Sequence, residues 1–390
     1  MAFYFHIDLN AFFVSCERIK DPSLIGKPIV VGGDSRRSIV STASYEARKF
    51  GIHSAMPIFQ AKELCKDLII VPVDMKYYKK KSNEFFHVIE QYSTQYEIAS
   101  IDECYIDITE IIPQYHDVIQ LAKTIQDHVL KEVGVGCSIG ISNNMFLAKM
   151  ASDLKKPLGI TVLNQQNIKY FLWPKDIEEM HGIGKKTAER LRTENILTIK
   201  DLANEKNIDI IKRVMGKHGY LYYKRANGFD YRNLDLDNDS FKSIGNSTTL
   251  SRDTIDDEVI KDTLLRLSRS VSMRAKNKQV VSDHITITIK YTLTKSVTKN
   301  FHMEEATNDE EKIYEYATML FDQIYNGEPV RLLGVSLNHV INLTDLTKQL
   351  SLFNYQLESP KKAEKQENEQ IKDLMKSLNL TYTSELLKKK

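Results

Sequence analysis

Runs of apolar residues alternate with amphipathic stretches at the start of the chain. The apolar and β-branched runs predict buried strands at residues 3–9, 27–34, 39–43, 69–73 and 136–141. Apolar side chains at helical spacing predict helices at residues 11–19, 44–51, 77–91, 118–133 and 143–153. Ser142 is expected to cap the last of these helices. The alternation of the two patterns predicts an α/β organisation for this part of the chain.

The pattern changes around Trp173, where short helices are expected, and again after residue 233. Residues 234–240 are polar and acidic, which is typical of a linker. Beyond them, an α+β segment is expected, with elements at residues 244–252, 256–276, 285–291, from about 310, and 332–340. The charge-rich residues from about 359 predict disorder, apart from one short amphipathic helix near residues 371–378.

Composition and charge narrow the possible function classes. The 390 residues allow two to four domains, and the net charge of +2 gives no global basic excess that would indicate nucleic acid. Four scattered cysteines without a Cys-x-x-Cys pair argue against a zinc site or a disulfide framework and fit a reducing cytosol. The sequence has no signal-peptide pattern and no apolar run of membrane-spanning length. We therefore expect a soluble, cytoplasmic protein with no membrane partner.

The main candidate for chemistry is residues 98–107, where apolar residues flank two adjacent carboxylates, Asp102 and Glu103. Adjacent acids repel each other unless a cation or a donor lies between them. A third carboxylate, Asp8, lies near the end of the first predicted strand. Two strands that each deliver carboxylate at one end favour a divalent metal site over a solvated turn. Mg²⁺ is the usual ion, because it takes hard oxygen ligands and completes its shell with substrate phosphates.

Two patterns that bear on DNA binding leave alternatives open. Gly182 and Gly184 precede Lys185 in a glycine turn that leads into a helix, which suits a phosphate oxygen or merely a corner between helices. The wider pattern matches a helix-hairpin-helix, which favours DNA-backbone binding. The second pattern is the stretch 266–299, which contains eight Lys or Arg residues and only one acidic residue. This stretch suits either a duplex backbone or a solvated surface.

The tail contains a separate candidate motif at residues 349–353. These residues gather three large apolar side chains within an otherwise polar segment. An exposed apolar cluster of this kind is typical of a segment that docks into a partner's pocket.

Together these stretches resemble the Y-family of translesion DNA polymerases, in its bacterial branch. The resemblance covers roughly residues 1–355 in the family's order. It is carried by the motifs Asp8-Leu-Asn-Ala-Phe-Phe, Ser41-Thr-Ala-Ser-Tyr-Glu-Ala-Arg-Lys-Phe-Gly, Ser54-Ala-Met-Pro, Ser100-Ile-Asp-Glu and Leu147-Ala-Lys-Met-Ala-Ser. Asn10 and Ala11 depart from the pattern, because related enzymes often have an acidic or bulkier residue there.

The resemblance implies an α+β multidomain fold with a right-hand polymerase arrangement. Its expected parts are a ferredoxin-like palm at residues 1–19 and 78–165, small fingers at 20–77, a helical helix-hairpin-helix thumb at 166–230, a linker at 231–241, an α+β little-finger domain at 242–342, and a flexible tail at 343–390. It also implies low-fidelity, template-directed DNA synthesis from dNTPs on a primer-template, without proofreading, by a monomer.

The resemblance further implies roles for single residues. Asp8, Asp102 and Glu103 would be the catalytic carboxylates that hold two Mg²⁺ ions, for which Mn²⁺ can substitute, with the carbonyl of Leu9 as a further ligand. Phe13 would be the steric gate that excludes a ribose 2′-hydroxyl. The other implied contacts are with the nucleotide, by Phe12, Thr42, Tyr45, Arg48, Ala55 and Lys156; with DNA, by Gly182, Gly184 and Lys185; and with the bacterial sliding clamp, by Gln349, Leu350, Leu352 and Phe353.

Two alternative functions remain open at this stage. Nucleotidyl cyclases resemble the same palm and its metal carboxylates, although a cyclase has no use for the glycine turn, the basic stretch or the clamp-like tail. A non-catalytic DNA-binding or clamp-associated factor is the other alternative, and the set of three carboxylates argues against it.

Overall fold

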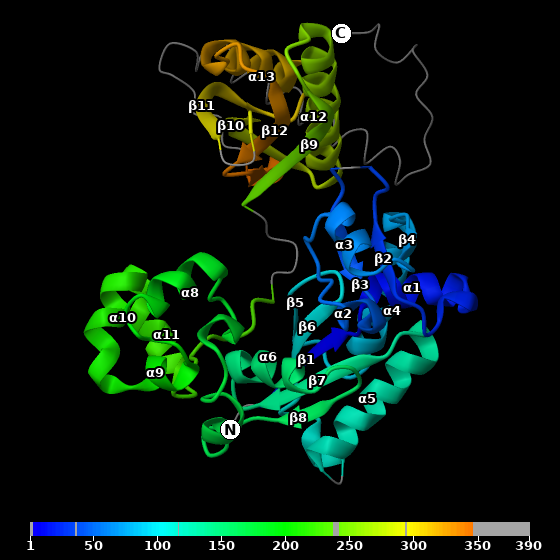
Figure 1. The fold of residues 1–390 in the computed structure, drawn as a ribbon, viewed down its shortest axis with the longest axis vertical. Coiled ribbons are helices and arrows are strands. Elements are labelled where there is room, and N and C mark those ends of the chain that lie inside the picture. The colour runs from blue at the N-terminus through cyan, green and yellow to red at the C-terminus, as the bar shows by residue number, and fades with distance from the viewer. Residues whose placement is uncertain (1–2, 36, 116, 237–241, 293–294, 346–390) are drawn as a thin grey trace, which may run out of the picture. The chain divides into compact units, whose positions relative to one another are not determined.

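The computed structural model describes residues 3–35, 37–115, 117–236, 242–292 and 295–345 (Figure 1). By its internal contacts the chain divides into two compact units, Met1–Ser240 and Phe241–Lys390. Among the described residues, every helix is too short or too polar to cross a lipid bilayer. The expected motif at 349–353 and the expected helix at 371–378 lie outside the described residues.

A five-stranded sheet forms the centre of the first unit. The strand order is β5 (Tyr96–Ile98), β6 (Glu103–Asp107), β1 (Tyr4–Leu9), β7 (Cys137–Ser142) and β8 (Ile160–Val162). Strand β8 is parallel to β7, and the other neighbours are antiparallel. One face of this sheet shares an apolar core with the helices α1 (Phe12–Lys20), α4 (Met75–Glu90) and α5 (Val118–Val133). The adjacent acids Asp102 and Glu103 lie where the antiparallel pair β5–β6 turns.

The opposite face of this sheet is covered by α6 (Met145–Leu154), which packs against Tyr4 and Tyr105. Gly140 of β7 allows this close approach. A Cβ at position 140 would lie 1.9 Å from the carbonyl oxygen of Ala148 in α6. Because side chains alternate along a strand, Phe5, Ile7 and Leu9 enter the apolar core, and His6 and Asp8 lie on the α6 side.

A smaller sheet lies within the same unit. It consists of β3 (Val40–Ala43), β2 (Ile29–Gly32) and β4 (Ile69–Val71), with the helices α2 (Tyr45–Arg48) and α3 (Ile58–Leu64). Strand β2 is antiparallel to β3 and parallel to β4. An apolar cluster that includes Val30, Ala47 and Ile58 holds the strands and helices together.

A group of short helices completes the described part of this unit. These are α7 (Ile168–Phe171), α8 (Lys185–Arg192), α9 (Ile199–Ala203), α10 (Ile208–Met215) and α11 (Gly219–Ala226). Their apolar core includes Phe146, Leu147 and Met150, so α6 joins this helical core to the central sheet. Short 3₁₀ turns occur at Pro22–Leu24, Ile112–Gln114, Ile177–Glu179, Glu205–Asn207, Gly216–His218 and, in the second unit, Leu343–Asp345.

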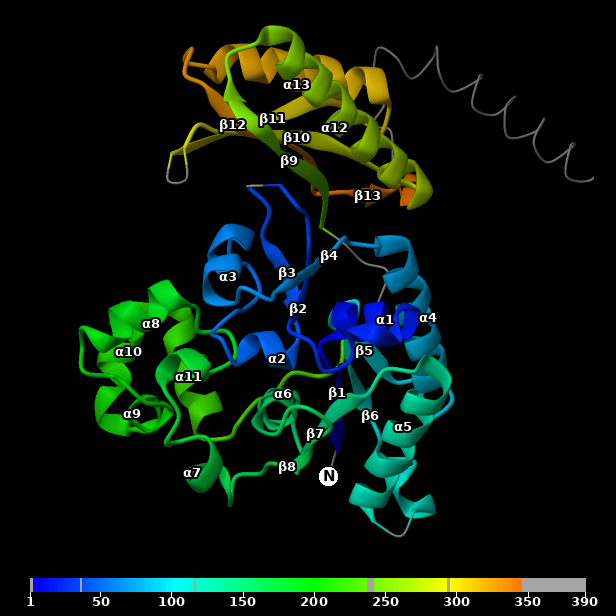
Figure 2. The ribbon, with the colours of Figure 1, turned by 45° about the vertical axis from the view of Figure 1, so that its right-hand side comes forward.

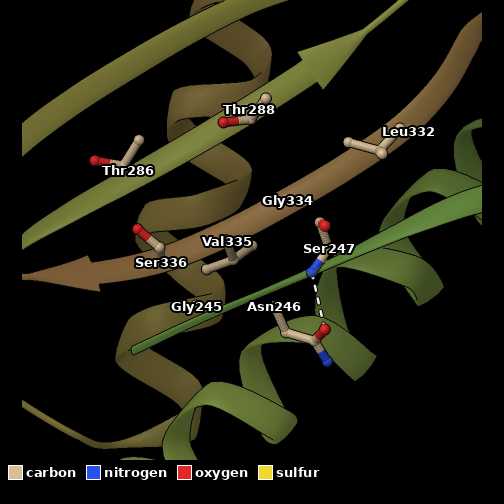
Figure 3. A pocket seen from close by; sticks show the side chains of 9 residues that line it. All are labelled: Gly245, Asn246, Ser247, Thr286, Thr288, Leu332, Gly334, Val335 and Ser336. Carbon is tan, nitrogen blue, oxygen red and sulfur yellow. Dashed lines mark hydrogen bonds between the residues drawn. The ribbon is translucent and has the colours of Figure 1, made fainter. Parts of the chain in front are cut away.

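The second unit is an antiparallel sheet with two helices on one face (Figure 2). The strand order is β11 (Ser296–Thr307), β10 (Val280–Lys290), β12 (Val330–Asn338) and β9 (Ser243–Thr254), and the short strand β13 (Ile341–Asn342) also pairs with β10. The helices are α12 (Asp257–Asn277) and α13 (Glu310–Ile324). Along β10, Ile285, Ile287 and Ile289 are buried, whereas Thr286 and Thr288 point away from the helices (Figure 3).

Two local expectations differ from the structure. The prediction that Ser142 caps the helix at 143–153 is wrong, because Ser142 ends β7 and the side chain of Asn144 accepts the capping hydrogen bond from Leu147 N. Strand β11 was not predicted. It is an edge strand with mostly exposed side chains, so its sequence has little hydrophobic alternation.

Candidate active site

The three predicted carboxylates converge at one end of the two central strands. Asp8 near the end of β1 lies directly opposite Glu103 at the start of β6. Asp102 immediately precedes β6, and its carbonyl oxygen accepts a hydrogen bond of 2.9 Å from Leu9 N. The antiparallel register therefore gathers residues that are more than ninety positions apart in sequence.

Two lysines hold these acids together. The ammonium of Lys149 in α6 lies 2.7 Å from Oε2 of Glu103 and 3.5 Å from Oδ2 of Asp8. Lys156, just beyond α6, lies 2.7 Å from the same oxygen of Asp8. Both lysines also pair with Asp153, at 3.6 Å and 2.7 Å. In the structure, the cations that pair with Asp8 and Glu103 are therefore side chains from the helix that covers this face of the sheet and from the loop just after it.

A fully buried histidine supports Glu103 from beneath. His6 Nε2 lies 3.3 Å from Oε2 of Glu103, and His6 Nδ1 lies 2.8 Å from the hydroxyl of Ser152. Burial lowers the pKa of His6, because a charged imidazolium loses its hydration there. The ring of His6 also packs edge-on against Tyr105. These contacts fix the Glu103 side chain at the base of the site.

The surroundings raise the pKa of Asp102 and lower the pKa of Glu103. Burial raises the pKa of Asp102, the charges of Asp8 and Glu103 add to the effect, and a hydrogen bond of 2.5 Å from Ser100 opposes it. Burial alone would also raise the pKa of Glu103, but the contact with His6 and the charge of Lys149 outweigh burial and hold the pKa well below its usual range. Among the described residues, no cationic side chain forms an ion pair with Asp102. The cluster therefore carries negative charge that its own lysines do not fully neutralise.

A cavity of about 350 Å³ opens at this end of the strands. It is lined by Asp8, Leu9, Ala11, Phe12, Phe13, Ser41, Thr42, Tyr45, Arg48, Ser54, Ile101, Asp102 and Lys156. Most of the residues that the resemblance assigned to metal, sugar or nucleotide therefore meet at one cavity. Glu103 lies behind the lining, and Ala55 is exposed next to Ser54 without lining the cavity.

The turn that joins β1 to α1 carries Phe13 into the cavity. Ala11 ends this turn in the left-handed conformation, with φ of 44°. The ring of Phe13 stacks on Tyr78 of α4, with centroids 4.3 Å apart and planes tilted by 13°. Tyr78 is in turn fixed by a hydrogen bond of 2.7 Å to Glu17. The position of the Phe13 ring is therefore set by packing against α4.

Asn10 ties three parts of the site together. Its side-chain NH₂ donates to the Ser138 hydroxyl at 2.8 Å, and its side-chain oxygen accepts from Leu158 N at 2.8 Å. Leu158 belongs to the loop that carries Lys156. The amide at a position that departs from the family pattern thus anchors this lysine loop to the end of β1.

Helix α2, beside the smaller sheet, contributes a guanidinium and a phenol to the cavity. Arg48 stacks over the ring of Tyr45, with its guanidinium carbon 4.7 Å from the ring centre, and Arg48 Nε donates to the carbonyl of Ala43. Burial raises the pKa of Tyr45, whose buried hydroxyl has no hydrogen-bond partner among the described residues. Together with Lys156 in the same lining, these groups suit an anion such as a phosphate.

The two glycines before α8 differ in their surroundings. Gly182 has φ of +89°, and a Cβ there would lie 2.4 Å from the Tyr222 hydroxyl, which itself donates to the Gly182 carbonyl. Gly184 has φ of −83°, and a Cβ there would meet open space. The turn itself therefore explains Gly182, whereas Gly184 leaves the helix N-terminus beside exposed Lys185 uncovered.

Lys149, His6 and Asn10 are site residues to which the sequence analysis assigned no function. Lys149 had one usable signal, because it is a charged residue within the almost wholly buried run of α6. His6 and Asn10 lie next to Asp8 in sequence, but their partners become visible only in the fold.

Comparisons with known proteins identify the chain. The model of the impB/mucB/samB family matches residues 7–153, that of its C-terminal domain matches 241–352, and the IMS family HHH motif matches 166–196. The chain is 41% identical to DNA polymerase IV of Bacillus velezensis and 39% identical to DNA polymerase IV 1 of Bacillus subtilis. Each alignment covers 99% of this chain and 92% of the relative.

Solved structures agree with these relatives. A Y-family DNA polymerase chimera of Dbh and Dpo4 is 28% identical, with a TM-score of 0.75, and an insertion ternary complex of Dbh DNA polymerase is 27% identical, with a TM-score of 0.61. Each match covers 87% of this chain and 99% of the solved chain. The chain belongs to the Y-family of DNA polymerases.

As a member of the Y-family, the protein is a DNA-directed DNA polymerase of translesion synthesis. Polymerases of this family are metal-dependent. The predicted resemblance, closest to bacterial DNA polymerase IV, is confirmed, as is the α+β right-hand polymerase fold. The relatives give no support to a cyclase or a non-catalytic factor.

Proposed function

We propose that this Y-family polymerase adds dNTPs to a primer 3′-hydroxyl with two Mg²⁺ ions, which Mn²⁺ can replace, held by Asp8, Asp102 and Glu103 and by the carbonyl of Leu9. The donor set fits: three carboxylates supply hard oxygen, and the half-buried Asp102 lacks an ion-pair partner among the described residues. When bound, the two ions would lower the pKa of the attacking hydroxyl and neutralise the departing pyrophosphate. Lys149 and His6 would orient Glu103 during this step.

The proposed nucleotide site is the same cavity. Arg48 and Lys156 would bind the triphosphate, with Thr42 and the Tyr45 hydroxyl as further donors. Phe12 and Phe13 lie next to each other in the lining. Phe13 would exclude a ribose 2′-hydroxyl by a steric clash, and its stacking on Tyr78 supports this role because a gate must not move aside.

The proposed macromolecular substrate is primer-template DNA. Relatives of this chain have been solved as ternary complexes of Dbh DNA polymerase, which supports DNA together with a nucleotide. Gly184 and Lys185, with Gly182 forming the turn, would bind a backbone phosphate at the uncovered N-terminus of α8. A phosphate contact of this kind reads no sequence, which suits an enzyme that copies any template.

We also propose the domain boundaries and partners given by the family. These are a palm at 1–19 and 78–165, fingers at 20–77, a thumb at 166–230, a linker at 231–241, a little finger at 242–342, and a tail at 343–390. Gln349, Leu350, Leu352 and Phe353 would dock on the sliding clamp and raise processivity by tethering. The enzyme would act as a cytoplasmic monomer, with the small Ala55 near the nascent base pair and low fidelity as the result.

The observation that carries this proposal is the direct pairing of Asp8 with Glu103 at a cavity that Asp102, Phe13 and Arg48 also line. The test is Mg²⁺-dependent primer extension past a bulky minor-groove guanine adduct. Asp102→Asn is expected to lower the rate at least about a thousandfold, because a lost metal ligand removes several kcal/mol of charge stabilisation.

The matched control is Asp107→Asn, at the other end of β6, where the carboxylate only accepts hydrogen bonds from Thr109. It is expected to extend primers at the wild-type rate. Equal extension by Asp102→Asn and the wild type would contradict the carboxylate assignment, and product formed from a nucleotide without any primer-template would restore the cyclase alternative.

A further inference from the structure

Four side chains with metal-binding groups gather on the open face of the sheet in the second unit, far along the chain from the proposed catalytic carboxylates. We call Asp283, His284, His302 and His339 the histidine cluster. Asp283 and His284 belong to β10, His302 belongs to β11, and His339 follows the last residue of β12. By the alternation along β10, His284 continues the row of Thr288 and Thr286, the two threonines that Figure 3 shows.

The contacts within the cluster are close. His284 Nδ1 lies 2.6 Å from one carboxylate oxygen of Asp283, and His302 Nε2 lies 3.2 Å from the other. The ring of His284 packs edge-on against the rings of His302 and His339, with centroids 4.7 Å and 4.9 Å apart. Among the described residues, Asp283, His284 and His302 are the one set of three acidic, histidine or cysteine side chains whose ligand atoms all lie within 4.8 Å of one another.

An irregularity in the sheet brings these side chains to one place. In a regular strand Asp283 and His284 would point to opposite faces, but the pairing of β10 with β11 shifts register between Ser282 and His284. The fully buried Ser282 hydroxyl fixes this shift, because it bonds to the backbone of His284 and to the carbonyl of Asn338. The same serine therefore holds the backbone beside both His284 and His339.

We propose that the histidine cluster is a binding site for one divalent transition-metal ion of the Zn²⁺ class, with Asp283, His284 and His302 as ligands. Two imidazoles and a carboxylate are the donors that such an ion prefers. The 3.2 Å between Asp283 and His302 is close to the separation of two ligands on a tetrahedral ion with bonds of about 2 Å. His339 borders the fourth, outward position.

The charge and exposure of the cluster favour an ion at this position. Burial alone would raise the pKa of Asp283, but its contacts with His284 and His302 outweigh burial and hold the pKa below its usual value, so the carboxylate is ionised. The side chains of His284 and Asp283 are about 40% exposed, and that of His302 is 66% exposed, so an ion can reach them from solvent. The four cysteines are buried elsewhere, so this site is independent of the cysteine-based zinc site that the sequence argued against.

The ion would stabilise the edge of the sheet. Strand β11 is held on one side only, by β10, and the ion would join His302 of β11 to Asp283 and His284 of β10. Binding therefore has a structural readout that does not depend on polymerase activity.

The test is a calorimetric titration of the untagged, chelator-stripped full chain with ZnCl₂ in excess Mg²⁺, which occupies the carboxylate site of the first unit. One Zn²⁺ per chain is expected to bind. His302→Ala and Asp283→Asn are each expected to weaken binding by roughly tenfold or more. His87→Ala, an exposed histidine of α4 beside Glu90, is the matched control and is expected to bind Zn²⁺ like the wild type.

Hydrogen exchange gives the second measurement. Zn²⁺ is expected to slow amide exchange in β11 of the wild type and of His87→Ala, and to leave it unchanged in His302→Ala. Absence of one-to-one binding, or equal affinity in all four proteins, would overturn the proposal. Binding of one Zn²⁺ that protects palm amides instead of β11 would assign the ion to the carboxylates and would equally overturn it.

Discussion

The two large sheets of this polymerase share a plan on one face and differ on the other. Each sheet packs one apolar face against helices. The second face of the central sheet is covered by α6, and it holds His6, Asp8 and Glu103 with the lysines that pair with them. The second face of the little-finger sheet is open, and uncharged residues such as Ser247, Thr286 and Ser336 line its shallow hollow (Figure 3).

The difference shows what a covering helix adds to a strand. Period-two alternation delivers polar side chains to the second face of either sheet. Only under α6 are these side chains desolvated and fixed by partners on three elements, as phosphoryl-transfer chemistry requires. The open face keeps its polar groups in water, where they can meet a surface but cannot hold several charges of one sign at close range.

The largest effect is expected when the cation that α6 supplies, Lys149, is removed. Lys149→Met removes the lysine partner of Glu103 and leaves this half-buried carboxylate without an ion-pair cation, whereas Asp8 keeps Lys156, so the free energy of unfolding should fall by up to about 3–5 kcal/mol without divalent ions. Mg²⁺ at ten times its Kd should restore about 1.4 kcal/mol. Chemical denaturation with and without Mg²⁺ measures both values.

The control for this variant lies in the other unit. Lys295→Met breaks an exposed pair with Glu328 and is expected to cost less than about 1 kcal/mol, with or without Mg²⁺. A Lys149→Met protein as stable as Lys295→Met would show that α6 does not create a distinct electrostatic environment.

The second effect is expected when the close packing of α6 on Gly140 of β7 is disturbed. Gly140→Ala would force a Cβ against the Ala148 carbonyl at 1.9 Å, so α6 must shift, at a cost of about 3 kcal/mol and with loss of most primer extension. For Gly334→Ala on the open face, the nearest atoms to the new Cβ are in the side chains of Ser247 and Thr288, at 3.2 Å and 3.5 Å, and the Asn246 carbonyl oxygen lies 3.7 Å away, so stability should change by less than about 1 kcal/mol. Thermal unfolding compares the pair, and equal losses would remove the contrast between the two faces.

The third effect is expected on the selection of deoxyribose over ribose at the cavity lined by Phe13. Phe13→Ala should raise ribonucleotide incorporation relative to deoxynucleotide by about a hundredfold, since removing a steric clash of about 2.7 kcal/mol has that effect. Tyr78→Leu removes the ring that fixes Phe13 without touching the cavity lining, so an intermediate loss is expected. Single-nucleotide insertion kinetics measure the ratio, and unchanged selectivity in Phe13→Ala would exclude Phe13 as the gate.

The smallest effect is on the lysine loop. Asn10→Ala removes the acceptor of Leu158 N, so Lys156 should lose its fixed position, and the KM for dNTP should rise about tenfold. Asn10→Asp retains that acceptor and should keep KM nearer the wild-type value. A tenfold loss in kcat with KM unchanged would instead mean that Asn10 acts on the carboxylates.

Much of this site could be predicted from the sequence. Asp8, Asp102 and Glu103 stood out because carboxylates at the ends of apolar strands are costly without a cation, and their register follows from the β1–β6 pairing. The partners of these acids could not be predicted in the same way. Lys149 and His6 act across 46 and 97 sequence positions, and no local pattern encodes which acid they face.

Elements whose own sequence has a clear hydrophobic pattern were predicted. Elements that form only through pairing with a neighbouring strand were missed. Helix α5 was predicted with both of its ends from its apolar side chains at helical spacing, and in the structure Gly134 ends it in the left-handed conformation. Strand β11 has few buried side chains, and the pairing that creates it comes from β10. For the same reason the sequence could not reveal the histidine cluster, since a register shift in the sheet assembles it.

The turn at Ala11 has a consequence for how this enzyme tolerates damage. Only four residues separate Asp8 from Phe13. Asp8 is proposed to hold metal, and Phe13 is proposed to exclude a ribose 2′-hydroxyl. A template distortion that displaces the incoming nucleotide from Phe13 must displace it from the metal carboxylate as well. If both proposed roles hold, the polymerase would accept an altered base and still reject a ribonucleotide, because the residue that excludes the 2′-hydroxyl and a residue that holds metal lie on one short segment of backbone.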